Sequence, residues 1–198
     1  MSRNLQLVIV GVGGQGILTV SDILGTAAIE EGLKAVMSEV HGMAQRGGVV
    51  TTEMKIGDFE SPLVAKGEAD VILGFEPVET YRTLEKASPR TGIVTNTDPL
   101  VPPGVSLGQG AYPKVEKLIE NMRNGGLKVI AVPALEIARS AGSTVAGNIV
   151  MLGAMVALEN FVLAREAVEA ALRKRIAPRW LDLNLKAFQM GYEAGKKQ

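Results

Sequence analysis

The sequence predicts a single α/β domain over residues 1–198, with a mostly parallel, doubly wound sheet and a helical C-terminal third. Three observations carry this prediction. Short runs rich in Val and Ile alternate with helical patterns through most of the chain, a glycine-rich turn joins the first run to the first helix, and the chain becomes helical after Pro133. No stretch has the composition of a linker between domains.

The expected strands are short and apolar. They cover residues 5–10, 34–38, 49–56, 71–73, 92–95 and 127–132. The third shows period-two alternation, with Val50, Thr52, Met54 and Ile56 on one face and Thr51, Glu53 and Lys55 on the other. Helices are expected from Ile17 onward and over residues 77–86, 134–141, 147–159, 165–176 and 181–194. Asn, Asp, Pro and Gly between residues 96 and 104 indicate loops.

A glycine pattern joins the first strand to the first helix. Gly11, Gly13 and Gly16 follow the order Gly-x-Gly-x-x-Gly, with Gly14 and Gln15 inside it. A strand, a glycine turn and a helix N-terminus present unpaired N–H groups and a positive dipole end to an anion. In such a Rossmann-like unit the first glycine permits the turn, the second admits a close approach, and the third lets the helix pack on its strand. The same spacing also occurs as a plain tight turn, so both interpretations stay open.

Glu39 keeps a dinucleotide-dependent oxidoreductase as an alternative. An acidic residue about 20 residues beyond the glycine turn, at the end of the second strand, binds the ribose in dinucleotide sites. Glu39 directly follows the strand expected over residues 34–38. Spacing alone therefore permits a nicotinamide or flavin nucleotide.

A second glycine-bearing segment, residues 39–48, follows the second strand and is expected at the same sheet edge as the first. His41 can donate or accept a hydrogen bond, Gln45 offers an amide, Arg46 offers a charged fork, and Gly47 exposes backbone. The two segments should line one crevice. His41 is either a hydrogen-bonded structural residue or a catalytic one, and Arg46 either binds an anion or pairs with Glu39 or a partner chain.

Composition excludes several classes of function. The net charge is +0 and no long basic run is present, so a nucleic-acid surface is not expected. The absence of cysteine excludes disulfides, thiol catalysis and thiolate-held iron–sulfur clusters within this chain. The longest apolar stretch, residues 149–158, is interrupted by Gly153 and is too short for a bilayer. The chain begins without a basic segment and long apolar stretch, so a cytoplasmic protein is expected.

The two glycine-bearing segments resemble a known family. Residues 11–17 resemble the opening of the gamma-type subunit of 2-oxoacid:ferredoxin oxidoreductases, and residues 39–47 are most similar to the beta subunit of its indolepyruvate branch. Further similarities follow in the same order at residues 74–79, 96–99, 102–103, 111–113 and 146–148. The resemblance thus spans nearly the whole chain.

The resemblance implies a subunit of a complex that oxidatively decarboxylates 2-oxoacids, reduces ferredoxin and releases acyl-coenzyme A. Gly57-Asp58-Phe59 departs from the Gly-Asp-Gly pattern of a thiamine diphosphate site. Thiamine diphosphate, magnesium and iron–sulfur clusters are therefore expected in a large alpha-type partner, within a hetero-oligomer, with this chain inactive alone. Coenzyme A would be a co-substrate. This chain would form a Rossmann-like cover that helps to shape the substrate or coenzyme A pocket and excludes water.

The expected site contains no metal ligand, and His41 is the one candidate for a catalytic role. The expected cofactor-binding residues are Gly11, Gly13, Gly14, Gln15, Gly16, His41, Gln45, Arg46, Gly47 and Asn148. Because Gly47-Gly48 is shared among branches of the family, a gamma subunit acting on pyruvate, 2-oxoglutarate or 2-ketoisovalerate remains an alternative. A purely structural interaction module is a further one.

Overall fold

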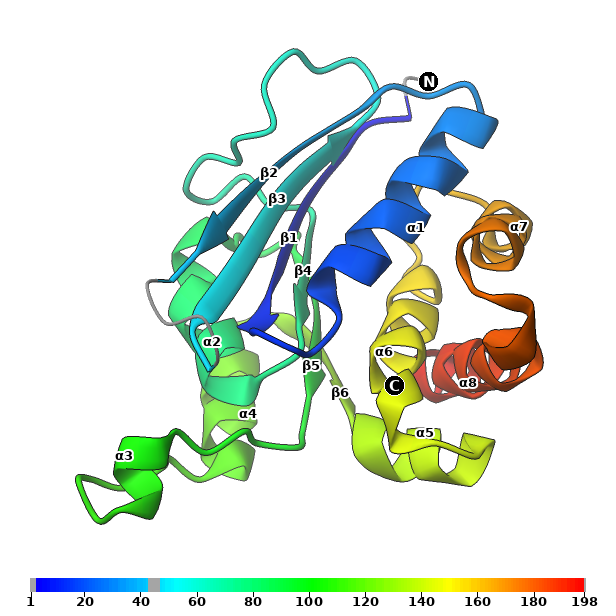
Figure 1. Cartoon of the computed structure of the whole chain (residues 1–198). Coiled ribbons are helices and arrows are strands. Elements are labelled where there is room, and N and C mark those ends of the chain that lie inside the picture. Colours follow the sequence, from blue (N-terminus) through cyan, green and yellow to red (C-terminus); the bar gives the residue numbers. More distant parts are fainter. Residues whose placement is uncertain (1–2, 43–46, 198) are drawn as a thin grey trace.

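The computed structural model describes residues 3–42 and 47–197. Its centre is a six-stranded sheet with helices on both faces (Figure 1). The strands are β1 Leu5–Val12, β2 Ala35–His41, β3 Val49–Ile56, β4 Val71–Gly74, β5 Gly92–Asn96 and β6 Lys128–Val132. The helices are α1 Ile17–Glu30, α2 Pro77–Arg82, α3 Pro103–Ser106, α4 Val115–Asn124, α5 Ala134–Ala141, α6 Gly147–Val156, α7 Arg165–Arg175 and α8 Pro178–Lys196, with short 3-10 turns at Thr83–Lys86 and Thr144–Ala146.

The strand order is β2-β3-β1-β4-β5-β6. Strands β1, β4, β5 and β6 pair in parallel, whereas β3 is antiparallel to both of its neighbours, β1 and β2. The predicted α/β class with a mostly parallel sheet and a helical C-terminal third is confirmed. The inverted β3 was not predicted, and it separates β2 from β1.

Two apolar layers cover the sheet. Leu7, Ile9 and Leu73 face the layer that contains α1, α5, α6, α7 and α8. Val8 and Ile72 face the opposite layer, where α4 contributes Ile119 and Met122. Alternation of large aliphatic side chains along buried parallel strands therefore supplies both layers from the same strands.

Helix α4 is an element that the sequence analysis missed. Its apolar residues Val115, Leu118, Ile119 and Met122 have the i, i+3, i+4, i+7 spacing of an amphipathic helix. Leu118, Ile119 and Met122 are buried. The signal was present in the sequence, in a stretch to which no element was assigned.

Several predicted boundaries were wrong by a few residues. Strand β1 continues to Val12, so Gly11 lies inside the strand, and β2 continues to His41, so Glu39 does not end it. Helix α2 gives way to a 3-10 turn after Arg82, and α6 ends at Val156. By contrast β3 matches the predicted range, and the four residues predicted to share one face, Val50, Thr52, Met54 and Ile56, are the buried ones.

The C-terminal helices α6 and α8 pack against each other with glycines at their contact, Gly153 in α6 and Gly191 in α8. A Cβ atom on Gly191 of α8 would lie 2.8 Å from the carbonyl carbon of Val150 in α6. A Cβ atom on Gly153 of α6 would lie 2.8 Å from the backbone nitrogen of Tyr192. Because no side chain of Gly153 or Gly191 separates the backbones at these points, the two helices are in direct backbone contact there.

Strand β2 forms one edge of the sheet. Two of its apolar side chains are open to solvent, Met37 at 50% and Val40 at 64% of their full exposure. No helix in the described part of the chain is long and apolar enough to cross a bilayer.

Candidate functional site

The glycine loop, residues 13–16, follows β1 and leads into α1. Gly14 and Gly16 adopt the left-handed conformation, with φ of 99° and 79°, which a side chain would disfavour. The N–H of Gly13 donates to the carbonyl oxygen of Gly48 at 2.9 Å, and this bond ties the loop to the segment that precedes β3. The predicted strand, glycine turn and helix N-terminus are thus all present.

The side chain of Gln15 stabilises the glycine loop through two hydrogen bonds to backbone groups. Its Oε1 accepts from the N–H of Val12 at 2.7 Å, and its Nε2 donates to the carbonyl oxygen of Phe75 at 3.0 Å. The side chain therefore connects the end of β1 to the connection between β4 and α2. We expected Gln15 to contact a cofactor, but the structure commits both ends of its amide to backbone groups of this chain.

Gly11 makes room for this brace. It pairs with Val50 within the sheet, and a Cβ atom at this position would lie 2.6 Å from Oε1 of Gln15 and 2.8 Å from Cβ of Phe75. From the sequence pattern, Gly11 was predicted to permit the turn itself. The structure corrects this assignment, since the missing side chain is required for the amide of Gln15 to reach Phe75.

Asn148 reaches the glycine loop from α6. Its Nδ2 lies 3.5 Å from the carbonyl oxygen of Gly16, to which it donates. A Cβ atom on Gly16 would overlap that amide nitrogen and lie 3.1 Å from Cγ of Asn148. Gly16 was expected to allow packing of the helix on its strand, but its closest neighbour is this residue of α6.

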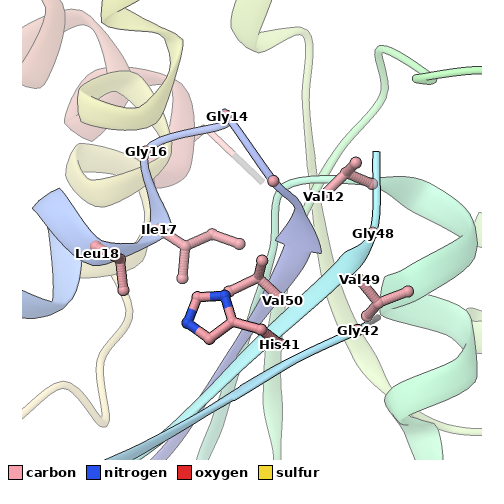
Figure 2. Close-up of a pocket in the computed structure, with 11 residues that line it drawn as sticks. Val12, Gly14, Gly16, Ile17, Leu18, His41, Gly42, Gly48, Val49 and Val50 are labelled. Carbon is pink, nitrogen blue, oxygen red and sulfur yellow. The ribbon is translucent and has the colours of Figure 1, made fainter. Parts of the chain in front are cut away.

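A hollow of about 780 Å³ opens beside the loop (Figure 2). Gly13, Gly14 and Gly16 line one part of it, and the end of β2 and the start of β3 line another. Figure 2 shows the imidazole of His41 on the side where Ile17 and Leu18 lie. The prediction that both glycine-bearing segments line one crevice is confirmed for the described residues.

The loop side of the hollow suits an anion. Among the described residues, none accepts a hydrogen bond from the N–H of Gly14 or Gly16. The first turn of α1 carries no acidic side chain that would oppose a negative charge. N–H groups at the N-terminus of a helix, here one of fourteen residues, together with the helix dipole, are the kind of donors that a phosphate or carboxylate needs.

The second glycine-bearing segment, residues 39–48, is described only in part. The side chain of His41 is exposed, and its Nε2 lies 3.4 Å from Oε2 of Glu39, a contact that leaves the imidazole at the mouth of the hollow. Gly47 adopts a left-handed conformation, with φ of 76°. Gln45 and Arg46 fall within residues 43–46, outside the described residues.

Glu39 does not occupy the position of a ribose-binding acid. It pairs with Thr52 of β3, two residues before β2 ends. Strand β3 separates β2 from β1, so Glu39 is one strand further from the glycine loop than in a dinucleotide site. Among the described residues, no three His, Cys, Asp or Glu side chains gather closely enough to hold a metal ion.

The fold and the hollow define a Rossmann-like domain in which a glycine loop lines the hollow and an antiparallel strand, β3, lies between β1 and β2. The chain belongs to the pyruvate ferredoxin/flavodoxin oxidoreductase family, whose sequence pattern matches residues 6–194. It is 43% identical over 188 residues to the indolepyruvate oxidoreductase subunit IorB of Archaeoglobus fulgidus, covering 95% of this chain and 94% of that protein.

Two solved structures share the fold. The gamma subunit of a keto/oxoacid ferredoxin oxidoreductase from Geobacter sulfurreducens superposes with a TM-score of 0.73 at 27% identity, covering 98% of this chain and 99% of that one. A 2-oxoglutarate:ferredoxin oxidoreductase from Magnetococcus marinus, solved with 2-oxoglutarate, coenzyme A and succinyl-CoA bound, gives 0.72 at 20% identity. The superposition covers 98% of this chain but only 31% of that longer polypeptide.

Gln15→Leu should lower the free energy of unfolding of the purified chain by about 2 kcal/mol. Leucine has a similar size, but it leaves the N–H of Val12 without Oε1 of Gln15. It also removes one of the two donors to the carbonyl of Phe75, which keeps the bond from Nδ2 of Asn96 at 3.2 Å. Denaturant unfolding measures the loss. An unchanged midpoint would show that the amide does not brace the loop.

Gln15→Glu is the matched control. A carboxylate still accepts from Val12 but cannot donate to Phe75, whereas a protonated carboxyl can do both. This variant should therefore regain stability as the pH falls, because the folded state favours the protonated form, and lose it as the pH rises. Gln15→Leu should show no such difference in pH dependence from the wild type.

Proposed function

We propose that the chain is the small subunit of an indolepyruvate ferredoxin oxidoreductase, and that its glycine loop forms part of the coenzyme A pocket of the assembled enzyme. The observation that carries the proposal is the hollow in which free N–H groups of the loop face apolar residues at the start of β3. The identity of 43% to an indolepyruvate oxidoreductase subunit, along nearly the full length of both chains, supports the substrate class.

The residues present fit coenzyme A. Its phosphates need N–H donors and a positive dipole, which the loop at Gly14 and Gly16 and the N-terminus of α1 supply. Its pantetheine arm needs an apolar wall, which Ile17, Leu18 and Val49 supply. When bound, coenzyme A provides the thiol that accepts the acyl group, while the chain itself binds and orients it and excludes water.

Redox chemistry is assigned to a large alpha-type partner. The sequence has no cysteine, so thiolate-held iron–sulfur clusters must be carried by another chain. The same partner would hold thiamine diphosphate and magnesium and would pass electrons to ferredoxin. The chain is then one component of a cytoplasmic hetero-oligomer. His41, which lines the hollow, would donate a hydrogen bond to a substrate rather than carry electrons.

The test compares the purified chain with the complex reconstituted from it and its large partner. The complex should reduce a viologen dye when given indolepyruvate and coenzyme A, and the chain alone should not. Intrinsic activity of the isolated chain would overturn the proposal and favour a free-standing oxidoreductase.

Substrate competition tests the branch of the family. The complex should show a higher kcat/KM with indolepyruvate than with pyruvate, 2-oxoglutarate or 2-ketoisovalerate. A preference for one of these three would assign the chain to that branch and leave the subunit role intact.

A further inference from the structure

Residues 99–113, here called the arm, leave the body of the molecule after β5 and return at the start of α4. Figure 1 shows its short helix α3 projecting away from the sheet, beyond the ends of α2 and α4. None of the residues in α3 is buried, and the side chain of Leu107 at the tip has 78% of its full exposure. Leu100 and Val101 near the base are exposed as well.

The buried carboxylate of Glu76 accepts hydrogen bonds from both ends of the arm. Glu76 is 2% exposed, and its Oε1 accepts from the hydroxyl of Tyr112 and from the N–H of Leu100, the latter at 3.4 Å. Its Oε2 accepts from the N–H groups of Val78 and Glu79 at the start of α2. Burial, and then the bond to Glu76, raise the pKa of Tyr112 well above its ordinary value, so the phenol remains a donor at physiological pH.

The tip holds its own shape. The N–H of Leu107 donates to the carbonyl of Pro103 at 3.0 Å, and the N–H of Gln109 donates to that of Gly104 at 2.9 Å. With its base fixed by Glu76 and its tip closed by these bonds, the arm is pre-organised rather than loosely tethered. Pre-organisation lowers the entropic cost of inserting such an element into a partner.

The arm carries no charge. Residues 99–113 contain no Asp, Glu, Lys or Arg, although such residues make up 21% of the whole chain. A projecting segment would ordinarily be solvated by charged side chains, whereas the centres of protein interfaces are depleted of them. The arm thus has the composition of an interface core in the position of a surface loop.

We propose that the arm inserts Leu107 into a neutral, apolar recess on the large subunit and so fixes the orientation of this chain on the complex. The inference rests on the proposed function, because it requires that such a subunit exists. It adds the surface through which the two chains meet.

The location of the arm favours the large subunit over a second copy of this chain. The base of the arm shares one hollow with Val12 at the end of β1, and Leu100 shares another with Gly14 of the glycine loop. The base of the arm thus adjoins the glycine loop, and a chain seated on the arm would lie next to the proposed coenzyme A pocket. In the Magnetococcus structure the same fold is one part of a longer polypeptide, which shows that it can be joined to the remainder of an enzyme.

The first test removes the arm without disturbing its base. Leu100 and Tyr112 bond to the same oxygen of Glu76, so about four Gly and Ser residues can replace residues 101–111 and span the gap. The shortened chain should unfold at the same temperature as the wild type. Its Kd for the large subunit should rise about 100-fold, as measured by calorimetry or by pull-down with the tagged large subunit.

The second test places a charge at the tip. Leu107→Asp should weaken assembly about 100-fold, whereas the matched control Leu63→Asp should leave it unchanged. Leu63 has 63% of its full exposure and follows β3, away from the glycine-loop edge of the sheet. Unchanged assembly of both arm variants would overturn the proposal.

Two further outcomes separate the possibilities. If the wild-type chain fails to assemble with the large subunit, the proposed function fails rather than the role of the arm. If light scattering shows a dimer of the isolated wild-type chain that arm removal abolishes, while binding to the large subunit persists, the arm pairs copies of this chain and the proposal is wrong.

Discussion

Gly191→Ala should destabilise the chain by about 3 kcal/mol, at the upper end of the range for overpacked cores. The added methyl group would lie 2.8 Å from the carbonyl carbon and 2.9 Å from Cα of Val150. Both are backbone atoms of α6, so no side chain can rotate away, and α8 must move off α6 as a unit. Thermal or denaturant unfolding of the purified chain measures the loss.

Gly25→Ala is the matched control. Gly25 lies inside α1, and the nearest atom to an added methyl group is Cε of Met54 at 3.7 Å, which is ordinary contact. Alanine in a helix interior is more favourable than glycine by about 0.5–1 kcal/mol, so this variant should be slightly stabilised. Equal destabilisation by both substitutions would contradict the close crossing of α6 and α8.

Gly16→Ala should impair both stability and turnover. The left-handed backbone costs about 1–2 kcal/mol once a side chain is present, and the methyl group would overlap the amide of Asn148. We expect a loss of about 3 kcal/mol in unfolding free energy for the isolated chain. Displacement of the loop should also lower kcat/KM for coenzyme A in the complex about 100-fold, since catalytic positioning is lost with shifts of about 1 Å.

Gly14→Ala distinguishes the cost of the left-handed backbone from the cost of steric overlap with Asn148. Gly14 is also left-handed, but no heavy atom lies within 4 Å of an added methyl group. It should therefore lose only about 1 kcal/mol. Combining Gly16→Ala with Asn148→Ala removes the overlapping amide. The loss in unfolding free energy caused by Gly16→Ala should then fall most of the way to the loss expected for Gly14→Ala. No recovery in the double variant would show that Asn148 is not the obstacle.

Local patterns sufficed for much of the fold. Alternation from Val49 to Ile56 predicted both the extent of β3 and its buried face, because a half-buried strand exposes every second side chain. The order of strand, glycine turn and helix at residues 5–30 was also predicted correctly. Helix α4 could have been predicted in the same way, because its apolar residues have the spacing of an amphipathic helix.

Long-range placement lay beyond the sequence. The direction of β3 depends on which strands it pairs with, and its own alternation is the same in either direction. For that reason the spacing of Glu39 suggested a ribose contact that the inserted strand does not support. The bond from Gln15 to Phe75 joins residues 60 positions apart, so no local pattern could show that this amide faces inward.

The edge position of β2 bears on how the chain behaves without a partner. Its seven residues, Ala35–His41, include no lysine, arginine or proline, the residues that commonly protect an exposed strand edge. Met37 and Val40 add apolar surface beside the unpaired backbone. The edge is therefore a template on which strands from other copies can be added, and we expect concentrated preparations of the isolated chain to associate through this strand.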